Sequence, residues 1–378
     1  MAKKILYIYG GLYSPNGMST IVSQKINYLA ENTDNDMYIV LTEHPEKPQI
    51  YQLSNKIHRK DLVVNFDDLD AMPFLKKIVC YFVKQRKSRK LITQYLMELR
   101  PDITISMTRR EINFLSKIKD GSKKVAEIHF ARTFYRKFDK KYLPRFVNKL
   151  ISKMWMNSLI KNLKKLDKFV VLTEEDSKNW PELHNVIVIP NFVSSIPIKK
   201  SKCVNKRAIA VGRYSYQKGF DMLIDAWKIV SSYYPDWQLD IYGAGNNIVY
   251  QDMANNMGLS SVHCNTAVSN LFDYYSDCSI FILSSRYEGL ALVILEAMRA
   301  GLPVVAFSCP CGPRDIIKNG ENGLLVENGN VQLLAEKICY LIENENERIR
   351  MGSKAVDCVA QYNKDAVMGE WIKLFNSL

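Results

Sequence analysis

The stretch from Ile280 to Ala306 reads IFILSSRYEGLALVILEAMRAGLPVVA, and its pattern decides the fold. An apolar run ends before Ser284, a glycine-containing turn follows, a helical stretch carries Glu296, and a second apolar run starts at Pro303. Short apolar runs separated by helical segments are typical of parallel strands joined by crossover helices. The stretch therefore predicts part of a doubly wound α/β sheet.

The same alternation extends in both directions along the chain. In the second half, strands are expected at residues 208–212, 238–243, 280–283 and 303–306. In the first half, they are expected at residues 5–9, 38–41, 103–106, 125–129, 169–172 and 186–189. A glycine-rich turn at residues 10–17 precedes a helix marked by Ile21, Val22, Ile26 and Leu29. Two Rossmann-like domains are the expected architecture.

A stretch without regular spacing separates the two halves, because Pro190 to Asn205 carries two prolines, three serines and three lysines. We expect an N-terminal domain at residues 1–190, a linker at 191–205 and a C-terminal domain at 206–362. The apolar residues Val367, Trp371, Leu374 and Phe375 recur at helical spacing. Residues 363–378 are therefore expected to form a closing helix that packs back on the N-terminal domain.

Composition excludes several classes of protein. The 378 residues are 47% hydrophobic and 24% charged, which suits two folded domains and argues against a disordered or fibrous chain. No run of eighteen apolar residues occurs, and the apolar stretch at residues 5–9 is too short for a signal peptide. The eight cysteines lack C-x-x-C spacing, so reduced thiols are expected rather than a zinc site. These features predict a cytoplasmic protein.

Positive charge is concentrated in the first half. Residues 1–190 contain 34 Lys and Arg against 20 Asp and Glu, whereas the remainder contains 18 against 19. Residues 74–100 hold eight cations and one acid, and residues 130–168 hold twelve cations and two acids among many aromatic and aliphatic side chains. This mixture indicates an interfacial surface on the inner face of the cell membrane, with a solvated basic surface as the alternative. The residues expected to contact the membrane, or a substrate carried in it, are Lys137, Lys140, Lys141, Arg145, Phe146 and Trp155. Nucleic acid is a weaker candidate, since no nucleic-acid-binding motif is present.

Two patterns in the second half carry chemistry. Arg213 follows a strand and Lys218 lies at the start of a helix, an arrangement that suits a diphosphate, although a basic turn capping a helix is the plainer alternative. Glu288 and Glu296 lie eight residues apart, so two helical turns bring both toward one cleft, where carboxylates can accept from sugar and ribose hydroxyls. Gly289 leaves room for a ligand near the backbone. Two ordinary helix carboxylates remain the alternative.

Taken together, these patterns resemble the family 4 retaining glycosyltransferases of GT-B fold. The resemblance covers nearly the whole chain. It rests on Gly212-Arg213 with Lys218-Gly219, on Ser285 to Ala306, and on the motifs EIH at 127–129, VVLT at 170–173, IPN at 189–191, GAG at 243–245 and GENGLLV at 320–326. It implies two facing Rossmann-like domains with a cleft between them.

The resemblance also implies roles for particular residues. Arg213 and Lys218 would bind the donor diphosphate, Glu288 the hydroxyls of the transferred sugar, and Glu296 the ribose. His129 would contact the transferred sugar near the reacting carbon. The implied catalytic residues are thus Arg213, Lys218, Glu288 and His129, and the implied donor-binding residues are Gly11, Gly212, Arg213, Lys218, Glu288, Gly289, Leu290, Ala291 and Glu296.

Two departures from the family pattern affect these assignments. The loop from Ser308 to Asp315 reads SCPCGPRD where relatives often carry several glycines, which puts the fit around the donor in question. His129 is followed by Phe130 rather than by the acidic residue often found there, which argues against orientation of the histidine by a neighbouring carboxylate.

The function implied is transfer, with retention, of a hexose or N-acetylhexosamine from a nucleotide diphosphate-sugar, with UDP as the expected nucleotide. The expected acceptor is a hydroxyl of a membrane lipid or lipid-linked glycan, as in bacterial glycolipid, sphingolipid or surface polysaccharide synthesis. Two D-x-D triplets, at 34–36 and 68–70, are expected in exposed loops, so no metal and no cofactor is expected.

Three alternatives are carried forward. A nicotinamide-dependent oxidoreductase is disfavoured, since no G-x-G-x-x-G turn is present. A non-catalytic module that binds sugar nucleotide or lipid would keep the fold without chemistry. A GT-B epimerase or phosphorylase would share the donor site.

Overall fold

The chain folds into two compact units. In the computed structural model, residues 2–14, 16–136, 144–194 and 199–378 are described. Unit 1 consists of Met1–Leu172, Ser177–Ile189 and Met368–Leu378, and unit 2 consists of Thr173–Asp176 and Pro190–Val367. The described part of the expected linker, residues 191–194 and 199–205, therefore lies in unit 2. Cys203 is buried there, and its carbonyl accepts a hydrogen bond from Arg348 Nε at 2.8 Å.

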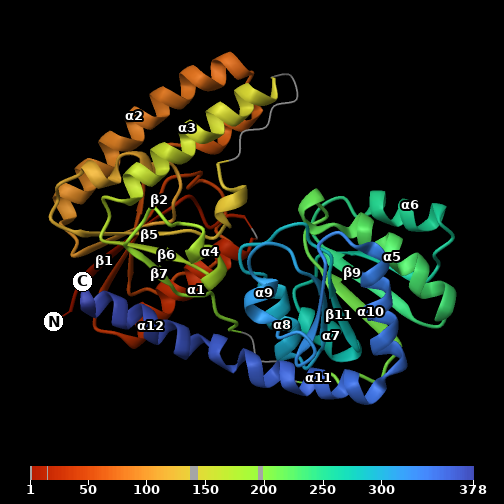
Figure 1. Cartoon of the computed structure of the whole chain (residues 1–378). Coiled ribbons are helices and arrows are strands. Elements are labelled where there is room, and N and C mark those ends of the chain that lie inside the picture. Colours follow the sequence, from red (N-terminus) through yellow and green to blue (C-terminus); the bar gives the residue numbers. More distant parts are fainter. Residues whose placement is uncertain (1, 15, 137–143, 195–198) are drawn as a thin grey trace. The chain divides into compact units, whose positions relative to one another are not determined.

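Unit 1 is built around a seven-stranded parallel sheet with the order β3-β2-β1-β4-β5-β6-β7 (Figure 1). Its strands are β1 (Lys4–Tyr9), β2 (Asp36–Leu41), β3 (Ile57–Asp61), β4 (Ile103–Ser106), β5 (Lys123–Glu127), β6 (Lys168–Val171) and β7 (Val186–Val188). Its helices include α1 (Gly17–Asn32), α2 (Phe74–Leu99), α3 (Arg145–Leu163) and the short 3-10 helices η1 (Phe66–Ala71), η2 (Arg110–Asn113), η3 (Leu115–Lys117) and η4 (Arg132–Phe134). Helix α4 (Glu174–Lys178) begins in unit 2 and ends in unit 1.

The centre of the unit 1 sheet follows from its sequence. Strand β1 is apolar from Ile5 to Tyr9 and fully buried over those residues, as expected for a parallel strand covered on both faces. The helix expected after the glycine turn is present as α1, and Asn16 caps it by accepting from the Ser19 N–H at 2.9 Å. All six strands expected in this half are present, with boundaries that differ by up to two residues.

Unit 2 contains a six-stranded parallel sheet with the order β10-β9-β8-β11-β12-β13. Its strands are β8 (Arg207–Val211), β9 (Gln238–Gly243), β10 (Val262–Thr266), β11 (Ile280–Leu283), β12 (Val304–Phe307) and β13 (Gly323–Val326). Its helices are α5 (Phe220–Tyr233), α6 (Ile248–Asn256), α7 (Leu271–Asp277), α8 (Leu292–Arg299), α9 (Pro313–Ile316), α10 (Val331–Glu343) and α11 (Glu345–Cys358), with 3-10 helices η5 (Tyr216–Lys218) and η6 (Val359–Tyr362). The strand–helix–strand unit predicted at residues 280–306 is β11, α8 and β12.

The last helix, α12 (Lys364–Ser377), begins in unit 2, and its part from Met368 onward belongs to unit 1. Trp371 and Phe375 are buried at 0% and 1% exposure. Lys3 Nζ donates to the Phe375 carbonyl at 2.6 Å, so both ends of the chain lie side by side in unit 1 (Figure 1).

One of the two D-x-D triplets lies in a helix rather than in the loop expected for it. Asp68 and Asp70 belong to η1, and both are exposed. Asp68 pairs with Lys84 at 2.9 Å and Asp70 with Lys77 at 2.8 Å. Acidic side chains in the first turn of a helix interact favourably with the helix dipole, and the two lysines of α2 hold η1 in place through these ion pairs.

Candidate functional site

The turn after β8 fixes the position of Lys218. Gly219 has a φ of +63°, and a Cβ added there would lie 2.2 Å from the carbonyl oxygen of Ser284, at the end of β11. The Ser284 hydroxyl in turn donates to the Lys218 carbonyl at 2.9 Å. Only glycine tolerates both the backbone angle and the close approach. The turn therefore packs directly against the carboxyl end of β11.

Lys218 and Glu288 form the central ion pair of unit 2. Lys218 Nζ lies 2.7 Å from Glu288 Oε1, and the two side chains are 14% and 7% exposed. The Ser285 hydroxyl donates to the same oxygen at 2.6 Å. Two donors thus converge on Oε1, which fixes both the ammonium and the carboxylate next to the start of α8.

The loop that precedes α8 is supported by the CPCG segment that departs from the family pattern. The Glu288 N–H points to the Pro310 carbonyl at 3.4 Å, and Gly312, with a φ of +89°, lies close to Leu290 and Ala291. A Cβ on Gly312 would lie 3.2 Å from the Ala291 nitrogen. The backbone amides predicted to bind the donor therefore lie at the N-terminus of α8, where N–H groups attract anions. They belong to Gly289, Leu290 and Ala291.

Glu296 lies two turns into α8 and is enclosed by apolar packing, although part of its surface stays accessible. Burial raises the pKa of Glu296 to about 7, against the opposing effects of the Tyr275 hydroxyl and the Lys218 charge. Tyr275 Oη approaches Glu296 Oε2 at 3.5 Å. Lys218, Glu288 and Glu296 are thus brought together in unit 2, and the charge of Glu296 is sensitive to pH near neutrality.

Arg213 and Gly212 complete the predicted residues of unit 2. Arg213 is exposed immediately after β8. A Cβ on Gly212 would lie 2.9 Å from Lys218 Cδ, so the lysine stem lies across this glycine. Tyr214 N–H donates to the Ala244 carbonyl at 2.8 Å, which joins the turn to the loop after β9.

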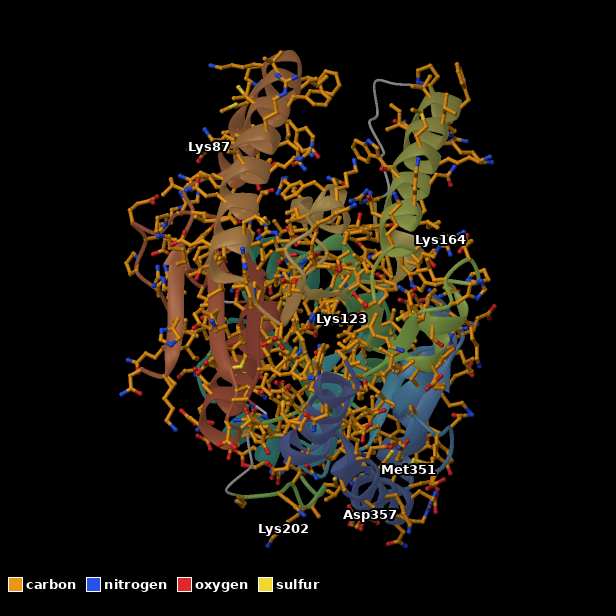
Figure 2. The ribbon with its side chains drawn as sticks, turned by 90° about the vertical axis from the view of Figure 1, so that its left-hand side faces the viewer. Lys87, Lys123, Lys164, Lys202, Met351 and Asp357 are labelled. Atoms are coloured by element: carbon orange, nitrogen blue, oxygen red, sulfur yellow. The ribbon has the colours of Figure 1, made fainter. Side chains whose placement is uncertain are left out.

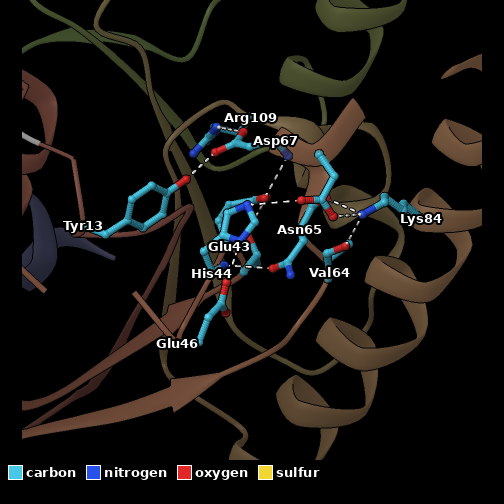
Figure 3. A network of polar contacts seen from close by, with 11 residues as sticks. Tyr13, Glu43, His44, Glu46, Val64, Asn65, Asp67, Lys84 and Arg109 are labelled. Atoms are coloured by element: carbon cyan, nitrogen blue, oxygen red, sulfur yellow. Dashed lines mark hydrogen bonds and ion pairs between the residues drawn. The ribbon is translucent and has the colours of Figure 1, made fainter. Parts of the chain in front are cut away.

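In unit 1, Gly11 lies in the loop that follows β1. Figure 3 shows the polar network next to this loop, with Tyr13, Asp67 and Arg109. A Cβ on Gly11 would lie 2.5 Å from the Tyr13 ring. Tyr13 Oη donates to Asp67 Oδ2 at 2.6 Å, and Arg109 Nη2 lies 3.4 Å from Asp67 Oδ1. Glu43, buried at 2% exposure, accepts from the Asp67 N–H at 3.1 Å.

The sequence analysis did not identify this polar group of Tyr13, Glu43, Asp67 and Arg109. They follow β1, β2, β3 and β4, respectively, at the edge where parallel sheets bind ligands. The signal available was a polar residue shortly after each strand, but β3 itself was not predicted.

His129 lies two residues beyond the end of β5, and its side chain is 6% exposed. Its Nε2 lies 3.0 Å from Glu127 Oε1. The expectation that no neighbouring carboxylate orients this histidine is wrong, because the carboxylate precedes the histidine by two residues instead of following it. Glu127 is itself paired with Lys25 of α1.

The residues expected at the membrane fall into two groups. Arg145, Phe146 and Trp155 lie on α3 and are exposed, Phe146 by 73%. Lys137, Lys140 and Lys141 lie outside the described residues.

Exposed apolar side chains form a stripe on α3, where Phe146 was predicted, and a second stripe on α2. On α3, Leu150 and Met154 continue the line of Phe146 at four-residue spacing. On α2, Val79, Phe82 and Val83 are each more than 60% exposed. Figure 2 shows both helices at the same end of unit 1, with Lys87 on α2.

The part of the chain that the structure describes contains neither a metal-binding cluster nor a membrane-spanning helix. Within residues 2–136, 144–194 and 199–378, apart from residue 15, no cluster of three or more His, Cys, Asp or Glu side chains is arranged to hold a metal ion. Among the same residues, every helix is too short or too polar to span a bilayer.

Comparison with known proteins extends these observations. Residues 197–357 match the family model of glycosyl transferases group 1. An uncharacterized glycosyltransferase of Haemophilus influenzae is 34% identical over 211 residues, which are 54% of this chain and 60% of that protein. The poly(ribitol-phosphate) alpha-N-acetylglucosaminyltransferase of Staphylococcus aureus is 30% identical over 227 residues, 58% of this chain and 46% of that protein. The matches thus span about half of these relatives.

Solved structures match over the full length of the chain. The crystal structure of TarM has a TM-score of 0.78 at 18% identity and covers 100% of this chain and 99% of its own. The structure of Anabaena HepE in complex with UDP-glucose has a TM-score of 0.70 at 16% identity and covers 100% of both chains. The two parallel-sheet Rossmann-like units and these likenesses establish the fold as GT-B.

Proposed function

We propose that this chain is a retaining, metal-independent glycosyltransferase that transfers a hexose or N-acetylhexosamine from a UDP-sugar to an acceptor hydroxyl. The observation that carries the proposal is the Lys218–Glu288 pair at the start of α8, with Glu296 two turns further on. The family match over residues 197–357, the names of the relatives and the bound UDP-glucose of the HepE structure support it.

The proposed mechanism assigns the leaving group to unit 2. As the bond between the anomeric carbon and the diphosphate breaks, negative charge grows on the phosphate oxygens. Lys218, exposed Arg213 and the N–H groups before α8 stabilise that charge. Glu288 accepts hydrogen bonds from hydroxyls of the transferred sugar while Lys218 and Ser285 hold its Oε1. The acceptor hydroxyl attacks from the face that the diphosphate leaves, and a phosphate oxygen takes its proton.

The test compares binding with turnover. Lys218→Ala should lower turnover by roughly a hundredfold or more, because one charge-stabilising donor is lost. Lys228→Ala, a lysine of α5 on the exposed side of the same unit, is the matched control and should leave turnover unchanged.

EDTA should leave turnover unchanged. A strict Mg²⁺ or Mn²⁺ requirement would contradict metal independence, and UDP-sugar binding without any transfer or donor turnover would favour the non-catalytic module. Donor turnover that yields an epimerised or phosphorolysed sugar would instead identify the GT-B epimerase or phosphorylase alternative.

We propose further that the acceptor is a membrane lipid or a lipid-linked glycan, reached from the inner face of the membrane through α2 and α3. The α3 stripe of Phe146, Leu150 and Met154 is 73%, 56% and 61% exposed, and Lys149 and Lys153 are exposed beside it. Apolar side chains that enter the headgroup region, flanked by cations, are what an interfacial helix requires.

Vesicle sedimentation tests this part of the proposal. Binding should require anionic lipid and weaken as salt rises, because much of the attraction is electrostatic. Lys149→Ser with Lys153→Ser should weaken it without changing UDP affinity. If the protein ignores anionic vesicles at low salt and glycosylates only soluble acceptors, such as a polyol phosphate polymer, the membrane proposal is wrong while the transferase proposal stands.

A further inference from the structure

A fully buried ion pair lies beneath His129 in unit 1. Lys25 of α1 and Glu127 at the end of β5 have side chains that are 2% and 0% exposed, and Lys25 Nζ is hydrogen-bonded to Glu127 Oε1. Trp371 of α12 covers the ammonium, with 3.9 Å from Nζ to the ring centroid. Helix α1, strand β5 and helix α12, which are far apart in the sequence, therefore meet at the Lys25 ammonium.

Stability alone does not account for such a pair. Removing two charges from water opposes folding, and apolar side chains of similar size often stabilise a core as well or better. The second carboxylate oxygen, Glu127 Oε2, has no hydrogen-bond partner among the described residues, and the same holds for Tyr7 Oη nearby. A buried ion pair with incomplete hydrogen bonding points to a role beyond packing.

The contact between His129 and the Glu127 oxygen that Lys25 also binds indicates this role. His129 Nε2 lies 3.0 Å from Glu127 Oε1, so this oxygen accepts from both Lys25 and His129. Burial opposes ionisation of Glu127, but Lys25 and His129 outweigh it and lower the pKa of Glu127 to about 2. A carboxylate that stays ionised can only accept hydrogen bonds, so Nε2 must carry a proton. In the neutral ring the lone pair is then on Nδ1.

We propose that Glu127, held by Lys25, is a positioning residue that fixes the ring orientation and the Nε2–H tautomer of His129. A ring held in one orientation would present His129 to the transferred sugar or the acceptor in a defined way. This part rests on the proposed transferase function and on the role that the family resemblance implies for His129, contact with the transferred sugar. The tautomer itself does not.

Nuclear magnetic resonance tests the tautomer without any substrate. The chain has five histidines, and His129→Asn identifies the His129 signals in long-range proton–nitrogen spectra. Near pH 8 the native protein should show His129 with Nε2 protonated and Nδ1 unprotonated. In Lys25→Met/Glu127→Gln the signals should shift toward a mixture of both tautomers, because an amide can either donate or accept. A native Nδ1–H tautomer, or no change in the double variant, would overturn the proposal.

The double variant is chosen because it stays neutral. Lys25→Met alone leaves an uncompensated buried carboxylate and is expected to unfold more readily. The matched control is Asp120→Asn/Lys124→Met, which removes another buried pair of this unit. The Lys124 side chain is 7% exposed and that of Asp120 0%, and Lys124 lies near the opposite end of β5. It carries a comparable structural defect and should leave the His129 tautomer unchanged.

Kinetics then test the positioning role. Lys25→Met/Glu127→Gln should lower kcat by roughly ten- to a hundredfold, as expected for a misplaced contact group, and leave UDP affinity unchanged, because UDP is assigned to unit 2. The control pair should retain kcat. A folded double variant with an altered tautomer and native kcat would refute the positioning role. If the native protein shows no transfer at all, the proposed function fails while the tautomer result is decided on its own.

Discussion

At the scale of the residue, Glu296 is a buried carboxyl group whose charge changes near neutral pH. Burial raises its pKa to about 7, so below that pH a growing fraction is protonated in the free protein. Ribose hydroxyls that donate to the carboxylate favour the ionised form. We therefore expect the affinity for the donor to fall as the pH drops below 7 and Glu296 becomes protonated.

The expected result is that UDP binding strengthens as pH rises toward 7 and levels off above it, by at most about tenfold per pH unit below 7. Isothermal titration between pH 5.5 and 8.5 measures it. Glu296→Gln should bind more weakly above pH 7 and retain only the titration of UDP itself. An identical pH profile in the native protein and the variant would remove Glu296 from the ribose site.

The sequence could predict that Lys218, Glu288 and Glu296 lie close together, because each belongs to a contiguous motif. It could not identify Lys25 as a partner of Glu127, since 102 residues separate them and only the sheet order brings α1 over the end of β5. The partner of His129 was misjudged for a related reason. The residue after the histidine is Phe130, which offers no carboxylate. Glu127 precedes the histidine by two positions, at the end of β5, where alternate side chains lie on the same face.

At the scale of the element, the turn between β8 and α5 depends on Gly219. Gly219→Ala combines a left-handed backbone with a Cβ 2.2 Å from the Ser284 carbonyl oxygen, so the turn must move and displace Lys218. Gly258→Ala is the matched control, because Gly258 has a φ of +74° but no atom within 4 Å of an added Cβ.

Urea unfolding should show a loss of about 1–2 kcal/mol for Gly258→Ala, from backbone strain alone, and a larger loss for Gly219→Ala. Only Gly219→Ala should also weaken UDP binding. Equal losses for the two variants would mean that contact with β11 does not constrain the turn.

The α2 stripe gives a second prediction at this scale. Val79→Ser/Phe82→Ser/Val83→Ser should reduce the salt-resistant part of vesicle binding, since these side chains supply apolar contact rather than charge. Ile248→Ser/Val249→Ser on α6 removes apolar side chains that are 63% and 59% exposed in unit 2 and should leave vesicle sedimentation unchanged. A reduction by both variants alike would indicate nonspecific adhesion.

The elements that the sequence failed to predict are β3, β10 and β13, and all three are edge strands. In β3 only Ile57 is buried, and β10 alternates between buried and more exposed residues. Edge strands need fewer apolar residues and often carry charges, so the continuous apolar run that marks a central parallel strand is missing. β13 is short and opens with Gly323, whose added Cβ would lie 2.5 Å from the Val304 carbonyl oxygen.

At the scale of the whole molecule, the architecture of two Rossmann-like units could be predicted, but the path of the chain between them could not. Thr173–Asp176 belongs to unit 2 although the strands on either side belong to unit 1. Glu175 explains this, because its N–H donates to Asp315 at 3.0 Å and its carboxylate pairs with Arg314 at 2.5 Å. Such contacts join residues about 140 positions apart, which no local pattern indicates.

The C-terminal helix is also divided between the two units, since α12 begins in unit 2 while Trp371 is buried in unit 1 beside Lys25. Trp371→Ala should cost about 3–5 kcal/mol, as expected for deletion of a large buried ring, and hydrogen exchange should accelerate in β1, β5 and α1. Trp227→Ala, which removes an equally buried tryptophan from the unit 2 core, should accelerate exchange in β8 and β9 instead. Because the two units have separate cores, each defect should stay within its own unit. If Trp371→Ala accelerates exchange equally in both sheets, the units unfold as one, and α12 transmits the loss of packing from unit 1 to unit 2.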